Sequence, residues 1–208
     1  MKEIDSVKIT TIVDNGVWER GLSLCWGLSF HVDLLKGNKK HAILMDTSGS
    51  FETFYHNALK VNIDLSSVKA VFISHWHADH CGALNQVLPL LKPQTPVFVP
   101  SENSFGIREI RDAGGIPVVC QESIEFIEGA MSTGDVANGL SEHSLLINVK
   151  EKGLVVLTGC SHPGLVNVLK NAQKVSGINR LAVSPSRVQK AYYYIMTQEI
   201  IIQGLGEV

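Results

Sequence analysis

The sequence is poor in cysteine and lacks any long apolar run. Its four cysteines, Cys25, Cys81, Cys120 and Cys160, are spread widely among 208 residues and form no Cys-x-x-Cys pair. No apolar run approaches the roughly 18 to 20 residues that a membrane-spanning helix needs, and the N-terminus lacks the apolar segment of a secretory signal. We therefore expect free thiols rather than disulfides, a cytoplasmic location and no contact with a membrane.

An excess of positive charge is also missing. The formal net charge is −2 at pH 7, so the chain offers no basic field to hold a polyanion, and we expect no nucleic acid as a partner. With 45% hydrophobic residues, a chain of this length can fill one core. This composition predicts a single domain over residues 1–208.

The densest chemistry lies in Ser74-His75-Trp76-His77-Ala78-Asp79-His80, directly after the apolar run 68–73. Packing alone does not explain three imidazoles and one carboxylate so close together, because His and Asp are costly to bury without a partner. The short apolar run predicts a strand whose carboxyl end carries the histidines. The first two histidines can then point to one side, and the Asp-His pair follows a turn. The pattern predicts two adjacent metal sites; the alternative is a polar loop that caps the next helix.

Strand-like and helix-like segments alternate along the rest of the chain. Short or alternating apolar runs predict strands at residues 7–13, 27–34, 41–45, 69–73, 96–100, 117–120, 144–149 and 154–158. Amphipathic spacing predicts helices between residues 50 and 67, from 82 to 91, from 106 to 112 and from 165 to 174. Residues 124–138 carry turn signals instead. This order favours helices packed on sheets.

Two other predicted strand ends carry polar residues. Asp46 follows the strand 41–45, where it is either a helix cap or a support for a neighbouring loop. His162 lies in Gly159-Cys160-Ser161-His162-Pro163-Gly164, between a strand and a helix, and so repeats the placement of the first cluster. We expect His162 to be a fifth metal ligand; the alternative is an ordinary lone histidine.

The motif His-x-His-x-Asp-His at residues 75–80 resembles the hallmark of the metallo-β-lactamase superfamily. The resemblance implies an α/β (α+β) fold, a four-layer αββα sandwich of two mixed β-sheets. It also implies that His75 and His77 serve one metal, that Asp79 and His80 serve the other, and that Asp46 orients their loop without binding a metal. Several further segments are similar to the dihydropterin-(ribofuranosyl)aminobenzene-phosphate synthase-like branch, from about residue 7 to 180: Asp14-Asn15, Gly27-Leu28-Ser29, Asp46-Thr47, Asn57-Ala58, Ser132-Thr133-Gly134 and Gly159 to Gly164.

The C-terminus departs from this branch. Its members usually continue into a strand ending Gly-Gly-Phe-His, whose histidine completes the metal site, whereas no histidine follows His162 here. Three residues are available as substitutes: His143 as a ligand, Cys160 as a zinc-binding thiolate, and Glu142 as an oxygen ligand or a structural acid. The apolar tail at residues 192–202 predicts a terminal strand or a surface for a homo-oligomer.

The resemblance implies a metal-dependent, hydrolase-type enzyme that uses a metal-bound hydroxide on a small, phosphorylated or pterin-like substrate. Histidine and carboxylate ligands suit zinc, at one or two sites, with manganese and iron as alternatives. Such a metal lowers the pKa of bound water from 15.7 to about 7, and Asp79 is then first a ligand and secondarily a catalytic proton acceptor. Two alternatives stay open: a general phosphoester, thioester or lactone hydrolase, and a truncated, non-catalytic metal-binding protein, which the missing late histidine favours.

Overall fold

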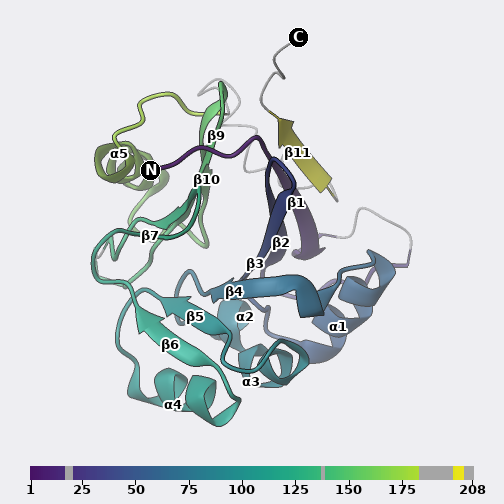
Figure 1. Ribbon diagram of the computed structural model, residues 1–208. Helices are drawn as coiled ribbons and strands as arrows, with labels where there is room; N and C mark the ends of the chain where they lie inside the picture. Colours follow the sequence, from purple (N-terminus) through teal and green to yellow (C-terminus); the bar gives the residue numbers. More distant parts are fainter. Residues whose placement is uncertain (17–20, 137–138, 183–198, 204–208) are drawn as a thin grey trace.

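The computed structural model describes residues 1–16, 21–136, 139–182 and 199–203, which form two β-sheets with helices packed around them (Figure 1). The larger sheet has the strand order β11-β1-β2-β3-β4-β5-β6. Its strands are antiparallel from β11 to β3 and parallel from β3 to β6. They are β1 (Ser6–Val13), β2 (Ser29–Lys36), β3 (Lys39–Met45), β4 (Val68–Phe72), β5 (Pro96–Val99), β6 (Ile116–Val119) and β11 (Glu199–Gln203).

The smaller sheet has the order β10-β9-β8-β7. Its strands are β7 (Ile124–Ile127), β8 (Ala130–Ser132), β9 (Leu145–Val149) and β10 (Gly153–Leu157). The family resemblance implies a mixed sheet here, whereas these four strands are antiparallel throughout. The reason is that each strand pairs with its neighbour in the sequence, and the described residues between them form no crossover helix.

Helices lie outside both sheets. They are α1 (Phe51–Lys60), α2 (Ala78–Cys81), α3 (Leu84–Val87), α4 (Ser104–Asp112) and α5 (Leu165–Ser176), with short 3₁₀ turns at Leu65–Ser67 and Leu88–Leu90. The side chain of Ser50 accepts a hydrogen bond from the Thr53 N–H, which caps α1 at its first turn. None of the helices in the described parts of the chain combines the length and the apolar character that crossing a membrane requires.

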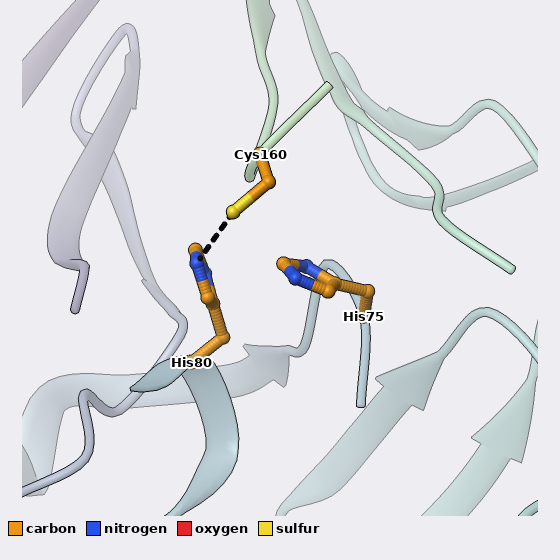
Figure 2. A group of neighbouring side chains, drawn as sticks. All are labelled: His75, His80 and Cys160. Atoms are coloured by element: carbon orange, nitrogen blue, oxygen red, sulfur yellow. Dashed lines mark hydrogen bonds between the residues drawn. The ribbon is translucent and has the colours of Figure 1, made fainter. Parts of the chain in front are cut away.

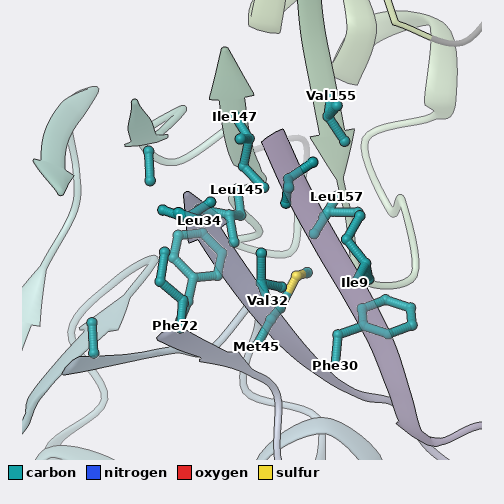
Figure 3. Packing of buried hydrophobic residues seen from close by; sticks show 14 of the residues in the cluster. Ile9, Phe30, Val32, Leu34, Met45, Phe72, Leu145, Ile147, Val155 and Leu157 are labelled. Carbon is teal, nitrogen blue, oxygen red and sulfur yellow. The ribbon is translucent and has the colours of Figure 1, made fainter. Parts of the chain in front are cut away.

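Three apolar clusters separate the layers. The largest lies between the two sheets and joins Phe30, Val32, Leu34, Met45 and Phe72 of the larger sheet to Leu145, Ile147, Val155 and Leu157 of the smaller one (Figure 3). A second cluster packs Leu44, Val71 and Val97 against Phe54 of α1 and Ile110 of α4, and a third packs Leu146 and Leu154 against Ala172 of α5. Neighbouring residues such as Leu44 and Met45 face opposite layers because side chains alternate along a strand. The result is the predicted four-layer αββα sandwich.

Parallel pairing of β3 with β4 positions the polar edge of the larger sheet. Met45 lies opposite Phe72, so the two strands end side by side and are followed by Asp46 and Ser74. The loop after β10 reaches the same edge from the smaller sheet, since a Cβ atom on Gly159 would lie 2.4 Å from the Ser74 hydroxyl oxygen. Three strand ends therefore meet at one place.

Two strand assignments differ from those predicted from the sequence. Residues 124–132 form β7 and β8 rather than turns alone, because a hairpin at Gly129 pairs these two short strands. The predicted strand 27–34 begins only at Ser29, since Gly27 has a φ of 135° and its backbone approaches the carbonyl oxygen of Asp79. In the apolar tail, residues 199–203 form a strand that pairs with β1, as one of the two alternatives predicts; residues 192–196 lie outside the described residues.

Candidate metal centre

Four histidines gather where the strand ends meet. The ring of His75 is the central one: its centroid lies 4.7 Å from that of His77, 4.2 Å from that of His80 and 4.9 Å from that of His162. His75 and His80 are buried, whereas His77 and His162 are exposed. The cluster therefore has a protected base and an open side.

Local backbone structure explains how one short segment supplies three of these rings. After β4 the chain continues without regular structure and bends at Trp76; His77, which precedes the first residue of α2, has an extended backbone with φ −73° and ψ 142°. The helix then turns the chain so that Asp79 and His80 face the cluster from another direction. The sequence did not predict α2, because four residues are too few to show a helical period.

The side chains form two groups with the donor types that bind metals. His75, His77 and His162 make one group, and His75, His80 and Cys160 make the other. Within each group the ligand atoms lie within 4.8 Å of one another. Figure 2 shows the second group, in which the Cys160 sulfur points at the His80 ring, 3.3 Å from Nε2.

Asp79 lies beside the second group. Its Oδ2 atom is 3.5 Å from Nε2 of His80, and its side chain is partly exposed. Of the five predicted ligands, the structure thus places His75, His77 and His162 together, His80 beside them, and Asp79 next to His80.

Asp46 lies under the cluster and is fully buried. Its Oδ2 atom is 2.6 Å from Nδ1 of His80, and its carboxylate also accepts hydrogen bonds from the Ser74 N–H and hydroxyl, each 2.7 Å long. With the Ser74 proton given to Asp46, the Ser74 oxygen accepts from Nδ1–H of His75 at 3.0 Å. Both buried rings therefore keep Nε2 as a free lone pair toward the cluster, which is the arrangement that ligation of a metal needs.

Electrostatics keep His75 neutral, whereas they favour the protonated forms of His80 and Cys160, so a metal must displace those protons on binding. Burial and the neighbouring histidines lower the pKa of His75 to about 3, so the ring stays neutral. Burial also works against the His80 cation, but the hydrogen bond and charge of Asp46 offset it and raise the His80 pKa overall. Partial burial and the nearby carboxylates raise the pKa of the Cys160 thiol to about 11, so a metal must displace the thiol proton on binding.

His143 does not join the cluster. It is fully buried, its Nε2 atom lies 2.8 Å from the Ile73 carbonyl oxygen, and its Nδ1 atom lies 2.8 Å from the Ser132 hydroxyl. Its ring also stacks on Phe72, with centroids 4.0 Å apart. Burial lowers the pKa of His143 to about 3. With both nitrogens engaged by the protein, this residue supports the site rather than substituting for a ligand.

The residues fit a metal ion by their chemistry. Imidazole nitrogens and a sulfur converge from two loops, and carboxylate and hydroxyl partners fix the buried rings from behind. Catalytic zinc sites use three protein ligands of these types and leave a position open, which matches the exposed side of this cluster.

Comparisons with known proteins agree with this arrangement. The sequence profile described as "Metallo-beta-lactamase superfamily" matches residues 32–126, which include the histidine-rich segment. A curated relative, the 7,8-dihydropterin-6-methyl-4-(beta-D-ribofuranosyl)-aminobenzene-5'-phosphate synthase of Methanocaldococcus jannaschii, is 26% identical over 225 residues, covering 86% of this chain and 76% of the relative.

Solved structures show the same fold. A quorum-quenching N-acyl homoserine lactone lactonase superposes with a TM-score of 0.52 at 11% identity, covering 86% of this chain and 90% of the other. A putative metallo-beta-lactamase from Thermotoga maritima gives a TM-score of 0.51 at 18% identity, with coverages of 85% and 95%. These findings confirm the predicted fold class and the resemblance to the superfamily and its dihydropterin-related branch.

Proposed function

We propose that this chain, which has the metallo-β-lactamase fold and resembles the dihydropterin-related branch, is a metal-dependent enzyme of the hydrolase type. One observation carries the proposal: donor atoms from two loops more than 70 residues apart in the sequence converge within 4.8 Å in each of two groups. Such convergence is costly unless a partner compensates for the buried polar groups.

The proposed ligands divide between two metals. His75, His77 and His162 would hold the first; His80 and Cys160, with Asp79 beside them, would hold the second. When bound, a divalent metal would lower the pKa of a water molecule to about 7 and polarise an ester or phosphoryl oxygen. Zinc suits the set best, because thiolate and imidazole together select it over manganese.

Asp79 has two tasks in this proposal. Its carboxylate lies 3.5 Å from Nε2 of His80 and is partly exposed, so it can reach both the second metal and a molecule that enters from solvent. Asp79 would first bind the metal and then accept a proton from the attacking water. Asp46, by contrast, stays buried and holds His80.

The proposed substrate is a small, phosphorylated or pterin-like molecule. The dihydropterin-related relative supports this class through 26% identity over most of both chains. A general phosphoester, thioester or lactone hydrolase is the second candidate, because the same metal chemistry acts on all three bonds. The structural similarity to a lactonase concerns the fold alone.

Metal content of protein purified without chelator tests the proposal. We expect about two zinc ions per chain, in line with a dinuclear site. His77→Ala should lose tight metal binding, whereas His41→Ala, on β3 and outside the cluster, should not. Full metal content in the His77→Ala variant would refute the ligand assignment.

Activity then separates the substrate classes. The zinc-loaded protein is offered an aryl phosphate ester, an aryl thioester, a lactone and a pterin phosphate, with His77→Ala as the matched control. Turnover of the pterin phosphate that depends on His77 supports the first candidate, and turnover of the other esters alone supports the second. Zinc binding without turnover of any of them would favour a non-catalytic metal-binding protein.

A further inference from the structure

One buried carboxylate holds the loop that carries Cys160 and His162. Glu142 is 1% exposed and lies just before β9. Its Oε1 atom accepts from the Ser161 N–H at 2.9 Å and from the Thr158 hydroxyl at 3.1 Å, and its Oε2 atom accepts from the His162 N–H at 2.8 Å. Two consecutive backbone N–H groups therefore point at a single side chain.

The loop takes an unfavourable shape at this point. Ser161 has a φ of 57°, the left-handed region that residues with a Cβ atom seldom adopt. That conformation aims the N–H groups of Ser161 and His162 in the same direction, which makes a small anion-binding concavity. Here the anion is the Glu142 carboxylate, so the strained loop and the buried charge stabilise each other.

The segment that carries Glu142 is tied to the other ligand loop. The neighbouring residue, His143, donates its backbone N–H to the Ser74 carbonyl oxygen at 3.0 Å, and its ring lies 2.8 Å from the Ile73 carbonyl oxygen. Ile73 and Ser74 lead directly into the first histidine motif. Residues 142 and 143 thus contact both ligand loops, one loop through each residue.

We propose that Glu142 is a positioning residue that sets the spacing between the two loops, and so the geometry of both proposed metal groups. This inference rests on the proposed function. Glu142 acts on the backbone N–H groups of Ser161 and His162, next to the two donors. The same loop supplies the third member of each group, Cys160 in one and His162 in the other.

Glu142→Gln is the variant that tests this role. Glutamine keeps the size of the side chain but replaces one acceptor oxygen with an NH₂ group, which faces an N–H donor in either orientation and loses at least one bond. We expect the zinc dissociation constant to rise about 10- to 100-fold, which is the usual effect of removing a residue that orients metal ligands. Stoichiometry at saturating zinc should stay unchanged, since no ligand is removed.

Two controls distinguish positioning from general stability. Glu3→Gln changes an exposed carboxylate, and Ile110→Val loosens the fully buried contact of α4 on the far side of the larger sheet. Neither should change the zinc affinity by more than about twofold, well below the effect expected of an orienting residue. A zinc dissociation constant for Glu142→Gln within about twofold of the wild-type value would overturn the inference.

Amide hydrogen exchange of the metal-free protein provides a second readout. We expect Glu142→Gln to speed exchange at residues 158–162 and to leave β1 and β2 unchanged. Unchanged exchange at residues 158–162 would refute the positioning role, whatever the metal measurements show. Failure of the wild-type protein to bind zinc would instead refute the proposed function, and the exchange result would still decide the role of Glu142.

Discussion

Asp46→Asn should weaken metal binding while leaving the fold intact. The carboxylate accepts three hydrogen bonds, from the Ser74 N–H, the Ser74 hydroxyl and Nδ1 of His80, at 2.6–2.7 Å. Asparagine has the same size but offers one oxygen and one NH₂ group. If the NH₂ group faces His80, the ring must accept at Nδ1, and its proton moves to Nε2.

That change of tautomer blocks the lone pair that would bind the metal. If the asparagine turns the other way, its NH₂ group opposes the Ser74 N–H, and a buried donor is left without an acceptor at a cost of about 1–3 kcal/mol. Either orientation therefore destabilises the arrangement in which Nε2 of His80 is free to bind a metal. We therefore expect zinc affinity to fall about 10- to 100-fold, which corresponds to roughly 1.4–2.7 kcal/mol.

Competition with a chromophoric chelator measures this affinity. Asp112→Asn is the matched control, because Asp112 is 70% exposed and pairs with Arg108 on the surface of α4. Far-ultraviolet circular dichroism should be the same for wild type and both variants. A folded Asp46→Asn variant that binds zinc as tightly as the wild type would show that Asp46 does not orient His80.

Three further outcomes follow from the structure. Gly159→Ala should destabilise the protein by about 1–3 kcal/mol, because its Cβ atom would lie 2.4 Å from the Ser74 hydroxyl oxygen. Denaturant unfolding measures this loss. As a control, Gly49→Ala should lower the free energy of unfolding less, because its Cβ atom would make ordinary contacts of 3.4 Å. The folded-state pKa of His143 is about 3, below its ordinary value of 6.5, so between these two pH values the unfolded state binds one more proton than the folded state. The free energy of unfolding should therefore fall as the pH drops from 6.5 toward 3, by at most ~1.4 kcal/mol per pH unit. His143→Gln should be less stable at pH 7 and lose less stability between pH 7 and 5 than the wild type, and parallel losses would contradict this. Cys160→Ser should abolish a sulfur-to-cobalt charge-transfer band in the cobalt-loaded protein, and a band that persists would exclude this thiolate as a ligand.

Local signals in the sequence predict helices packed on sheets and the first ligand loop, whereas the four-layer order follows from the resemblance to the metallo-β-lactamase superfamily. His75, His77 and Asp79 all lie within seven positions of the end of β4, so their common location can be read without tertiary information. The roles of Glu142 and His143 depend on contacts across 16 to 70 residues, which periodicity does not encode. From the sequence alone both residues are candidate substitute ligands, whereas in the structure the Glu142 carboxylate and the neutral His143 ring bind the backbone of the ligand loops.

The described residues offer three ligands for each of the two proposed metals. Nδ1–H of His75 donates to the Ser74 oxygen, which leaves the ring one lone pair, at Nε2. This Nε2 atom lies 3.1 Å from Nδ1 of His77. In our proposal His75 therefore serves the first metal, together with His77 and His162. The proposed second metal would then have His80, Cys160 and Asp79; Oδ2 of Asp79 lies 3.5 Å and Sγ of Cys160 lies 3.3 Å from Nε2 of His80. Catalytic zinc sites commonly have three protein ligands and one open position. On this count Cys160 would give the proposed second metal its third ligand, and a sulfur ligand would shift that site toward zinc and away from manganese.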